Sequence, residues 1–359
     1  MKTFDDFLAR RSPTLLGFGE PTHWIEAFPL FRNEVFQHLV LEHGYRSIAL
    51  ESDCLAGRLV DRYVTTGEGD LDQVLATGFS HGFGAFPSNR ALVEWLRDHN
   101  AGRAPEDQVR FHGFDAPLEM ASAPSPRAVL TELHGFLSEH LADVPSDVAT
   151  IERLAGDDAV WADEAAMWDG AKAHGNSPEA RELRLIADDL AGVFARSRPA
   201  LPAGGDLLSR TAVGLCRYHS LMADTSAERL GRLGAQRDAM MADNLLALPG
   251  TFVSAHNQHL QRRAASMMGA QWWSAGAQVA HRLGDRYVFI ATDFGSSDAV
   301  QDPAPGTLQA YLAETVPDRE LVETAGIDPG LPARPGDGRG YLPFDAVEAA
   351  DAIAFLRRV

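Results

Sequence analysis

Short apolar runs recur in the first and last thirds of the chain, separated by longer stretches with mixed polarity. Five of these runs end in polar or turn residues: Thr14–Gly19, Ser47–Glu51, Val109–Asp115, Thr251–His256 and Tyr287–Asp293. They lack a clean alternation of apolar and polar positions, which is typical of strands covered on both faces and usually of parallel sheets. We therefore predict five strands of a mainly parallel central sheet.

The stretch after the first run has the periodicity of an amphipathic helix. Apolar residues recur there at spacings of three and four, and Gly44 supplies a helix stop. A second helix is predicted over Asn89–Asn100, just before the third strand. A strand followed by a helix and another strand makes a βαβ unit, so the predicted fold class is α/β, with helices covering the sheet.

The middle of the chain, residues 117–248, has a different character. Strand signals are absent there, and long segments rich in Ala, Leu, Glu and Arg are typical of helices. We expect a helical insertion or cap within a single α/β domain of residues 1–359. The Pro- and Gly-rich stretch "DPGLPARPGDGRGYLPFD" predicts irregular structure, and a short closing helix is expected up to Val359.

Composition narrows the classes of partner. The formal net charge of −18 disfavours binding to nucleic acid phosphates and to anionic membranes. The first residues lack the apolar core of a secretory signal, and no stretch is long and apolar enough to cross a bilayer. The two cysteines, Cys54 and Cys216, form no CxxC pattern. We expect a cytoplasmic protein whose partner is a small-molecule substrate.

Ionisable residues follow four of the five predicted strands. Glu20 and His23 come after the first strand, Glu51 ends the second and Asp115 ends the third, while the fourth runs into "HNQH" with His256 and His259. The carboxyl ends of parallel strands lie along one edge of the sheet, where ligands bind in open α/β folds. These side chains are therefore expected to converge on one site.

Each of these strand ends also has an ordinary structural interpretation. Thr22 could cap the helix that begins near Trp24, and Glu51 could be a favourable charge at a helix start. Asp115 could be a turn residue, and Asn257 could cap a short helix beside the two histidines. One shared site accounts for all four strand ends more simply than four separate coincidences.

Several familiar sites are missing from the sequence. It has no HExxH motif and no glycine-rich phosphate loop. What remains is a set of imidazoles and carboxylates, which suits either general acid–base catalysis or the binding of a divalent metal.

The same residues carry a resemblance to the erythromycin esterase family. Its members share a "GExTH" loop, an "ALE" strand end, a "GxD" strand end, a helix of the type "RDxxMAxN" and a strand ending in "HNxH". The matching segments here are Gly19–His23, Ala49–Glu51, Gly113–Asp115, Arg237–Asn244 and His256–His259. Arg32 also falls where the family carries an arginine. These motifs occur in the family's order and span most of the chain.

The resemblance implies hydrolysis of a macrolide-like lactone or ester by a histidine that activates water, without a metal or other cofactor. His23 would be the general base, and Glu20 or Glu51 would orient its ring. His256, His259 and Arg32 would polarise the carbonyl and stabilise the oxyanion.

Further residues are expected to bind the substrate or support the site. Arg237 would pair with a site carboxylate, and Asp115 and Asn257 would also line the substrate site. Trp24 departs from the family pattern, which has a small residue at that position. Its indole would offer a flat apolar wall at the mouth of the site.

Two other functions remain open from the sequence. A biosynthetic lyase, cyclase or isomerase would use the same histidine as a base on a carbon acid or hydroxyl. Alternatively, the cluster of Glu20, His23, Glu51, His256 and His259 would bind a metal or haem without turnover.

Overall fold

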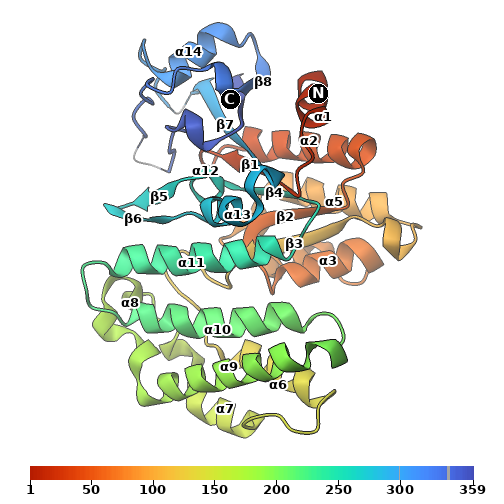
Figure 1. Cartoon of the computed structure of the whole chain (residues 1–359), viewed down its shortest axis with the longest axis vertical. Coiled ribbons are helices and arrows are strands. Elements are labelled where there is room, and N and C mark those ends of the chain that lie inside the picture. The colour runs from red at the N-terminus through yellow and green to blue at the C-terminus, as the bar shows by residue number, and fades with distance from the viewer. Residues whose placement is uncertain (299, 338–339) are drawn as a thin grey trace.

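The computed structural model describes residues 1–298, 300–337 and 340–359, and a seven-stranded sheet forms its centre (Figure 1). The strand order is β3-β2-β4-β1-β7-β9-β8. All neighbouring pairs are parallel except β8 and β9. The strands of this sheet are β1 (Leu15–Glu20), β2 (Ser47–Asp53), β3 (Arg110–Asp115), β4 (Thr251–His256), β7 (Tyr287–Ser296), β8 (Arg319–Glu323) and β9 (Ala352–Arg358). The predicted α/β class is confirmed.

Helices cover both faces of this sheet. On one face, Leu16, Phe18 and Phe252 pack in a cluster with α1, α2, α3, α4 and α5. On the other, Val253 and Phe289 pack with α11, α13 and α14. The strands are therefore buried on both sides, which explains their continuous apolar runs. The bounds of these helices, apart from α11, are Lys2–Ala9, Ala27–His43, Gly57–Thr66, Leu71–Thr77, Pro87–Asn100, Ala275–Leu283 and Leu308–Thr315.

The predicted helix after the first strand is α2, and it ends where the sequence indicates. Gly44 adopts a left-handed conformation with φ of 71°, and its amide donates to the Leu39 carbonyl. Glycine reaches this conformation without the steric cost of a Cβ atom, so it terminates the helix. The helix begins at Ala27 rather than near Trp24, and its N-cap residue is Glu26. Thr22 accepts the Trp24 amide at 3.3 Å in the preceding loop and does not cap the helix.

The middle of the chain forms a stack of helices below the sheet in Figure 1. They share a separate apolar cluster, which includes Leu133, Leu190 and Leu215. No strand lies between β3 and β4, a part of the chain in which every residue is described. The uppermost helix, α11, packs against both α10 and β3. The helices are α6 (Arg127–Ser138), α7 (Val148–Ala155), α8 (Ala165–Trp168), α9 (Pro178–Ser197), α10 (Gly205–Met222) and α11 (Arg229–Leu246).

The predicted closing helix at the C-terminus is wrong, because Ala352–Arg358 forms strand β9. Its residues Ala352 to Phe355 are almost fully buried between β7 and β8, so tertiary packing overrides the helical preference of Ala and Leu. The sequence also did not predict β8 or the antiparallel hairpin of β5 (Ala264–Met267) and β6 (Ala270–Trp273). In the described part of the chain, no helix combines the length and apolarity needed to span a bilayer.

Candidate active site

The four strands with ionisable ends are neighbours in the sheet, in the order β3-β2-β4-β1. Glu20, at the end of β1, is in register with His256, at the end of β4. The rings of His23 and His256 lie with their centroids 5.4 Å apart. The structure therefore brings the first-strand and fourth-strand residues into one cluster at the carboxyl edge of the sheet.

His23 is held between two carboxylates. Its Nδ1 lies 2.7 Å from Glu20 Oε1, and its Nε2 lies 3.9 Å from Glu51 Oε1. Burial favours the neutral ring, but the charges of Glu51 and Glu20 outweigh burial and raise the pKa of His23 above its usual 6.5. A bond from Nδ1–H to Glu20 leaves the lone pair on Nε2, which is the arrangement a general base requires.

Glu51 is the anion shared by this cluster. Its Oε2 accepts the backbone amide of His256 at 2.8 Å, and its Oε1 accepts Arg237 Nη2 at 3.0 Å. Burial opposes ionisation, yet the charges of His259, His23 and Arg237 hold the pKa of Glu51 well below its usual range. Glu51 is therefore a buried carboxylate that stays charged.

His259 belongs to a hydrogen-bonded chain that links the site to the β5–β6 hairpin. Its Nδ1 donates to Asp238 Oδ1 at 2.6 Å, and Trp272 Nε1 donates to the other oxygen of Asp238. Its Nε2 lies 3.4 Å from Glu51 Oε1. Burial disfavours the charged ring, but Asp238 and Glu51 raise the pKa of His259 to about 9. At neutral pH this ring is an imidazolium.

His256 differs from the other two histidines because both of its ring nitrogens have protein partners. Its Nε2 donates to the Pro21 carbonyl at 3.1 Å, and its Nδ1 accepts the Gln258 amide at 3.1 Å, so it is the N-cap of the short helix α12 (Asn257–Leu260). Burial and the nearby His23 lower the pKa of His256 to about 3. It is a neutral ring that braces the Pro21 loop.

Asp115 and Arg237 form a buried ion pair behind Glu51. Arg237 Nη2 lies 2.6 Å from Asp115 Oδ2, and Asp115 also accepts His81 Nε2 at 3.1 Å. Burial opposes ionisation of Asp115, but Arg237 and His81 lower its pKa overall. Asp115 is fully buried, so its oxygens serve the protein rather than an incoming molecule.

A cavity of about 30 Å³ opens beside His23, which is room for a water molecule. Arg32 lies in its wall, with Nε bonded to Asn33 and Nη2 to Asn33 and Asn89. Burial lowers the pKa of Arg32 to about 10, so it remains charged at neutral pH. The other lining residues are Glu20, Pro29, Leu50, Glu51, Phe79, Phe83, Phe86, Ser254 and Ala255.

Trp24 and Asn257 lie at opposite extremes of exposure. The Trp24 side chain is 60% exposed and packs 6.0 Å from Phe86, measured between ring centroids. Asn257 is 2% exposed, and its amide donates to the Thr292 carbonyl at 2.9 Å. A Cβ at Gly19 would lie 2.2 Å from Asn257 Oδ1, so this side chain needs a glycine in β1.

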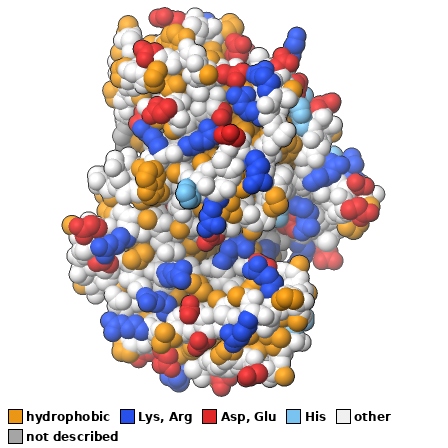
Figure 2. All heavy atoms as spheres, in the orientation of Figure 1, with side chains coloured by type: hydrophobic (Ala, Val, Ile, Leu, Met, Phe, Trp, Pro, Cys, Tyr) orange, Lys and Arg blue, Asp and Glu red, His pale blue; other side chains and the backbone are white. Residues whose placement is uncertain are grey.

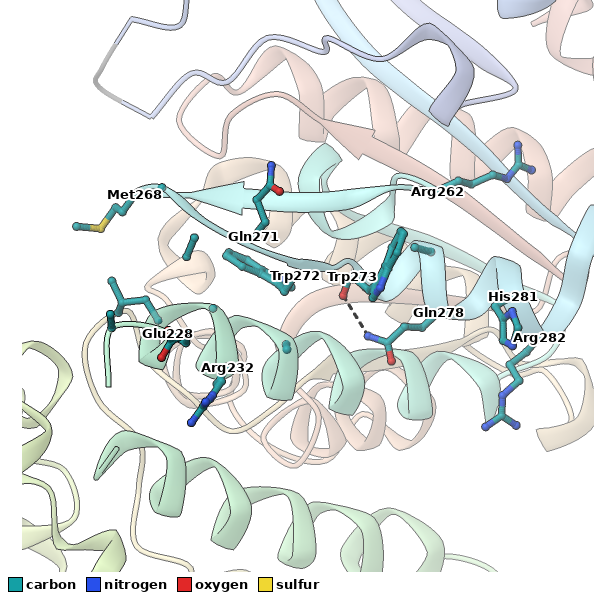
Figure 3. Close-up of a pocket in the computed structure, with 17 residues that line it drawn as sticks. Glu228, Arg232, Arg262, Met268, Gln271, Trp272, Trp273, Gln278, His281 and Arg282 are labelled. Carbon is teal, nitrogen blue, oxygen red and sulfur yellow. Dashed lines mark hydrogen bonds between the residues drawn. The ribbon is translucent and has the colours of Figure 1, made fainter. Parts of the chain in front are cut away.

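A wide groove of about 1240 Å³ lies over the β5–β6 hairpin, α11 and α13 (Figure 3). Figure 2 shows basic side chains over the middle of the same face, although the chain is strongly acidic overall. Trp272 lines the groove and lies against Gly234 of α11, where an added Cβ would be 2.6 Å from the indole. The groove therefore borders the Trp272–Asp238–His259 chain.

Three residues of this network, Asp238, His81 and Trp272, were not predicted from the sequence. Asp238 stood beside Arg237 in the helix motif, and an acid next to a predicted site arginine is a usable signal. His81 and Trp272 carried no such signal, because a lone histidine in a loop and a tryptophan in an unpredicted hairpin have no characteristic spacing. Only the tertiary fold brings them to the site.

The donor atoms of the site are mostly committed to hydrogen bonds. Glu51, Asp115 and His256 each have protein partners on the atoms that would bind a metal. Within the described ranges, the one group of three such side chains with ligand atoms within 4.8 Å of one another is Asp5, His38 and His43, outside this cluster. The site geometry therefore favours acid–base chemistry over metal ligation.

Comparison with known families decides the relationship. The erythromycin esterase family matches residues 40–358, which is most of the chain. This chain belongs to the erythromycin esterase family. Membership of this family indicates a hydrolase that acts on small molecules. The match begins after Glu20 and His23, so the assignment of these two residues depends on the geometry described above.

Solved structures share the fold at low sequence identity. A Bacillus cereus protein is 17% identical, with a TM-score of 0.75 and coverage of 97% of this chain and 89% of that one. A succinoglycan biosynthesis protein is 15% identical, with a TM-score of 0.70 and coverage of 97% and 88%. A mutant of the erythromycin esterase EreC, in its open conformation, is 18% identical, with a TM-score of 0.71 and coverage of 98% and 92%. No curated protein matches the sequence.

Proposed function

We propose that this member of the erythromycin esterase family hydrolyses an ester or lactone of a small molecule, with His23 as the general base. The observation that carries the proposal is the position of His23 between Glu20 and Glu51 beside a cavity with room for a water molecule. A base works best when its pKa lies near the working pH, and the pKa of His23 is raised from 6.5 by its two carboxylates.

In the proposed reaction, His23 Nε2 takes a proton from water as the water oxygen bonds to the carbonyl carbon of the substrate. The carbonyl oxygen becomes an oxyanion, and the imidazolium of His259 and the guanidinium of Arg32 are the nearby cations that would stabilise it. The intermediate then expels the alkoxide, which receives the proton back from His23. The products are a carboxylic acid and an alcohol.

The remaining predicted residues fit supporting roles in this proposal. Arg237 and Asp115 keep Glu51 charged and in place, and His256 fixes the backbone of the Pro21 loop. Asn257 ties the start of α12 to β7. Trp24, exposed beside Phe86, offers an apolar surface for a ring-shaped substrate such as a macrolide-like lactone.

The cavity also supports a second candidate. Three phenylalanines, Phe79, Phe83 and Phe86, form part of its wall, and such an apolar lining would suit a reaction on a carbon acid or hydroxyl from which added water is excluded. A biosynthetic lyase, cyclase or isomerase would use His23 in the same way. The two candidates differ in whether solvent oxygen enters the product.

The test is turnover of a panel of macrolides and simpler lactones in ¹⁸O-labelled water. Hydrolysis predicts one labelled oxygen in the carboxylate product, together with loss of turnover in His23→Ala. His140→Ala, a surface change beyond the end of α6, is the matched control and should keep full activity. Product without label would contradict hydrolysis, and an active His23→Ala variant would contradict the assigned base.

A further inference from the structure

A second cluster of ionisable side chains lies outside the site, where α1 packs on α2. Asp5 is on α1, and His38 and His43 are on the second half of α2. All three side chains are partly exposed, at 41%, 19% and 26%. The proposed catalytic mechanism uses none of them.

The three side chains direct their polar atoms to one point. Asp5 Oδ1 lies 2.5 Å from His38 Nε2 and 2.7 Å from His43 Nε2. The two imidazole rings meet edge to face, with centroids 5.5 Å apart and planes inclined at 63°. One oxygen thus faces two ring nitrogens, and the three donor atoms lie within 4.8 Å of one another.

We propose that Asp5, His38 and His43 form a binding site for a divalent transition metal, with Zn²⁺ as the best chemical fit. Two imidazoles and one carboxylate are a common ligand set for Zn²⁺, and the fourth tetrahedral position would face solvent. Zn²⁺ bonds of 2.0–2.1 Å at tetrahedral angles separate ligand atoms by about 3.3 Å. The present contacts would have to widen by less than about 1 Å, a small movement for partly exposed side chains.

A metal at this point would fasten α1 to the rest of the molecule. The helix packs Phe4 against Phe18 and Phe31, with ring centroids 6.4 and 6.2 Å apart. It has eight residues, and an isolated helix of that length is unstable in water. The cross-link between two helices would therefore stabilise the docked position of α1.

The site is separate from the proposed catalytic cluster along α2. Arg32, which lines the catalytic cavity, precedes His38 by six residues and His43 by eleven, or about 9 and 16 Å of helix axis. Metal binding can therefore be measured without a substrate. Failure of the proposed hydrolase activity would leave this inference untouched, and the reverse also holds.

The experiment uses the full-length, untagged protein after removal of metals with a chelator and desalting. Zn²⁺ is titrated in competition with a chromogenic chelator, and one equivalent should bind. Since loss of partners that only orient a ligand costs about 10–100-fold in affinity, His38→Ala and His43→Ala should each weaken binding by at least about 100-fold. His140→Ala, a surface histidine elsewhere, should bind as the unmodified chain does.

A second measurement covers variants that fold poorly. His43→Gln keeps a hydrogen-bond donor but removes the imidazole, so it should fold yet lose the metal-dependent rise in Tm, which we expect to be at least about 2 °C in the unmodified protein. Binding that survives in His38→Ala and disappears in His259→Gln would place the metal in the catalytic cluster and overturn the proposal. Absence of Zn²⁺ binding in the unmodified chain would also overturn it, and the cluster would then be an ordinary set of ion pairs.

Discussion

Replacement of Glu51 by Gln gives the sharpest test of the electrostatics of the site. The change keeps the shape of the side chain and removes its charge. Glu51 lies 3.9 Å from His23 Nε2 and 3.4 Å from His259 Nε2, so both rings lose a stabilising anion. The amide oxygen of the introduced glutamine can still accept the backbone amide of His256.

The size of the effect follows from these distances. At an effective dielectric constant of about 20, two unit charges 3.9 Å apart interact by about 4 kcal/mol. Arg237 already pairs with the same carboxylate and offsets part of this attraction. We therefore expect the pKa of His23 to fall in Glu51→Gln, by less than the full interaction between the two charges would give.

The direction of each change can be read from a pH–rate profile. His23 must be neutral to act as a base, so kcat/KM should rise with pH through its pKa, above 6.5 in the unmodified enzyme. The rate should fall again near pH 9 as the His259 imidazolium loses its proton. In Glu51→Gln both limbs should move to lower pH. The surface variant Glu152→Gln on α7 should leave both limbs in place, and unmoved limbs in Glu51→Gln would refute the electrostatic role.

Three further outcomes follow from the same contacts. The free energy of unfolding should fall as pH rises from 6.5 to about 9, because His259 binds its proton more tightly in the folded protein than in the unfolded chain. In urea titrations, the free energy of unfolding of His259→Gln should depend less on pH over this range. Gly234→Ala would place a Cβ 2.6 Å from Trp272, so the indole should shift away from Asp238. Without that donor Asp238 should hold the His259 proton more tightly, and the alkaline limb should move to higher pH. An unchanged profile would show that the hairpin does not influence the site. Asp115→Asn would remove one of the carboxylates that pair with the buried guanidinium of Arg237, and the free energy of unfolding should drop by about 3–5 kcal/mol. A loss under about 1 kcal/mol would show that the ion pair is well solvated.

The parts of the fold that the sequence predicted are those with strong local signals. The bounds of β4 agree with the prediction at both ends, and Gly44 ends α2 as expected. Strand β9 was mistaken for a helix because "AIAFLRR" consists mainly of residues that favour helices, and only its neighbours β7 and β8 make it a strand. The hairpin of β5 and β6 is short and partly exposed, so its pattern is weak.

The sequence predicted which residues form the candidate site better than it predicted their hydrogen bonds and charges. The ends of parallel strands meet at one edge, so Glu20, Glu51 and His256 were expected together, and the structure brings them together. Which histidine is charged depends on the distances between the ring nitrogens and their partners, and these distances cannot be read from the spacing of residues in the sequence. His259 donates a hydrogen bond to the carboxylate of Asp238, whereas both ring nitrogens of His256 form hydrogen bonds only with backbone groups.

Helix α11 carries two consecutive residues that serve different parts of the site. Arg237 reaches Glu51 and Asp115 on the sheet, while Asp238 orients His259. The same helix packs against α10 in the stack below. A tilt of that stack would therefore displace Arg237 and Asp238 together. Amino-acid changes at the α10–α11 boundary, far from the reacting atoms, would then alter the activity without replacing any residue that contacts the substrate.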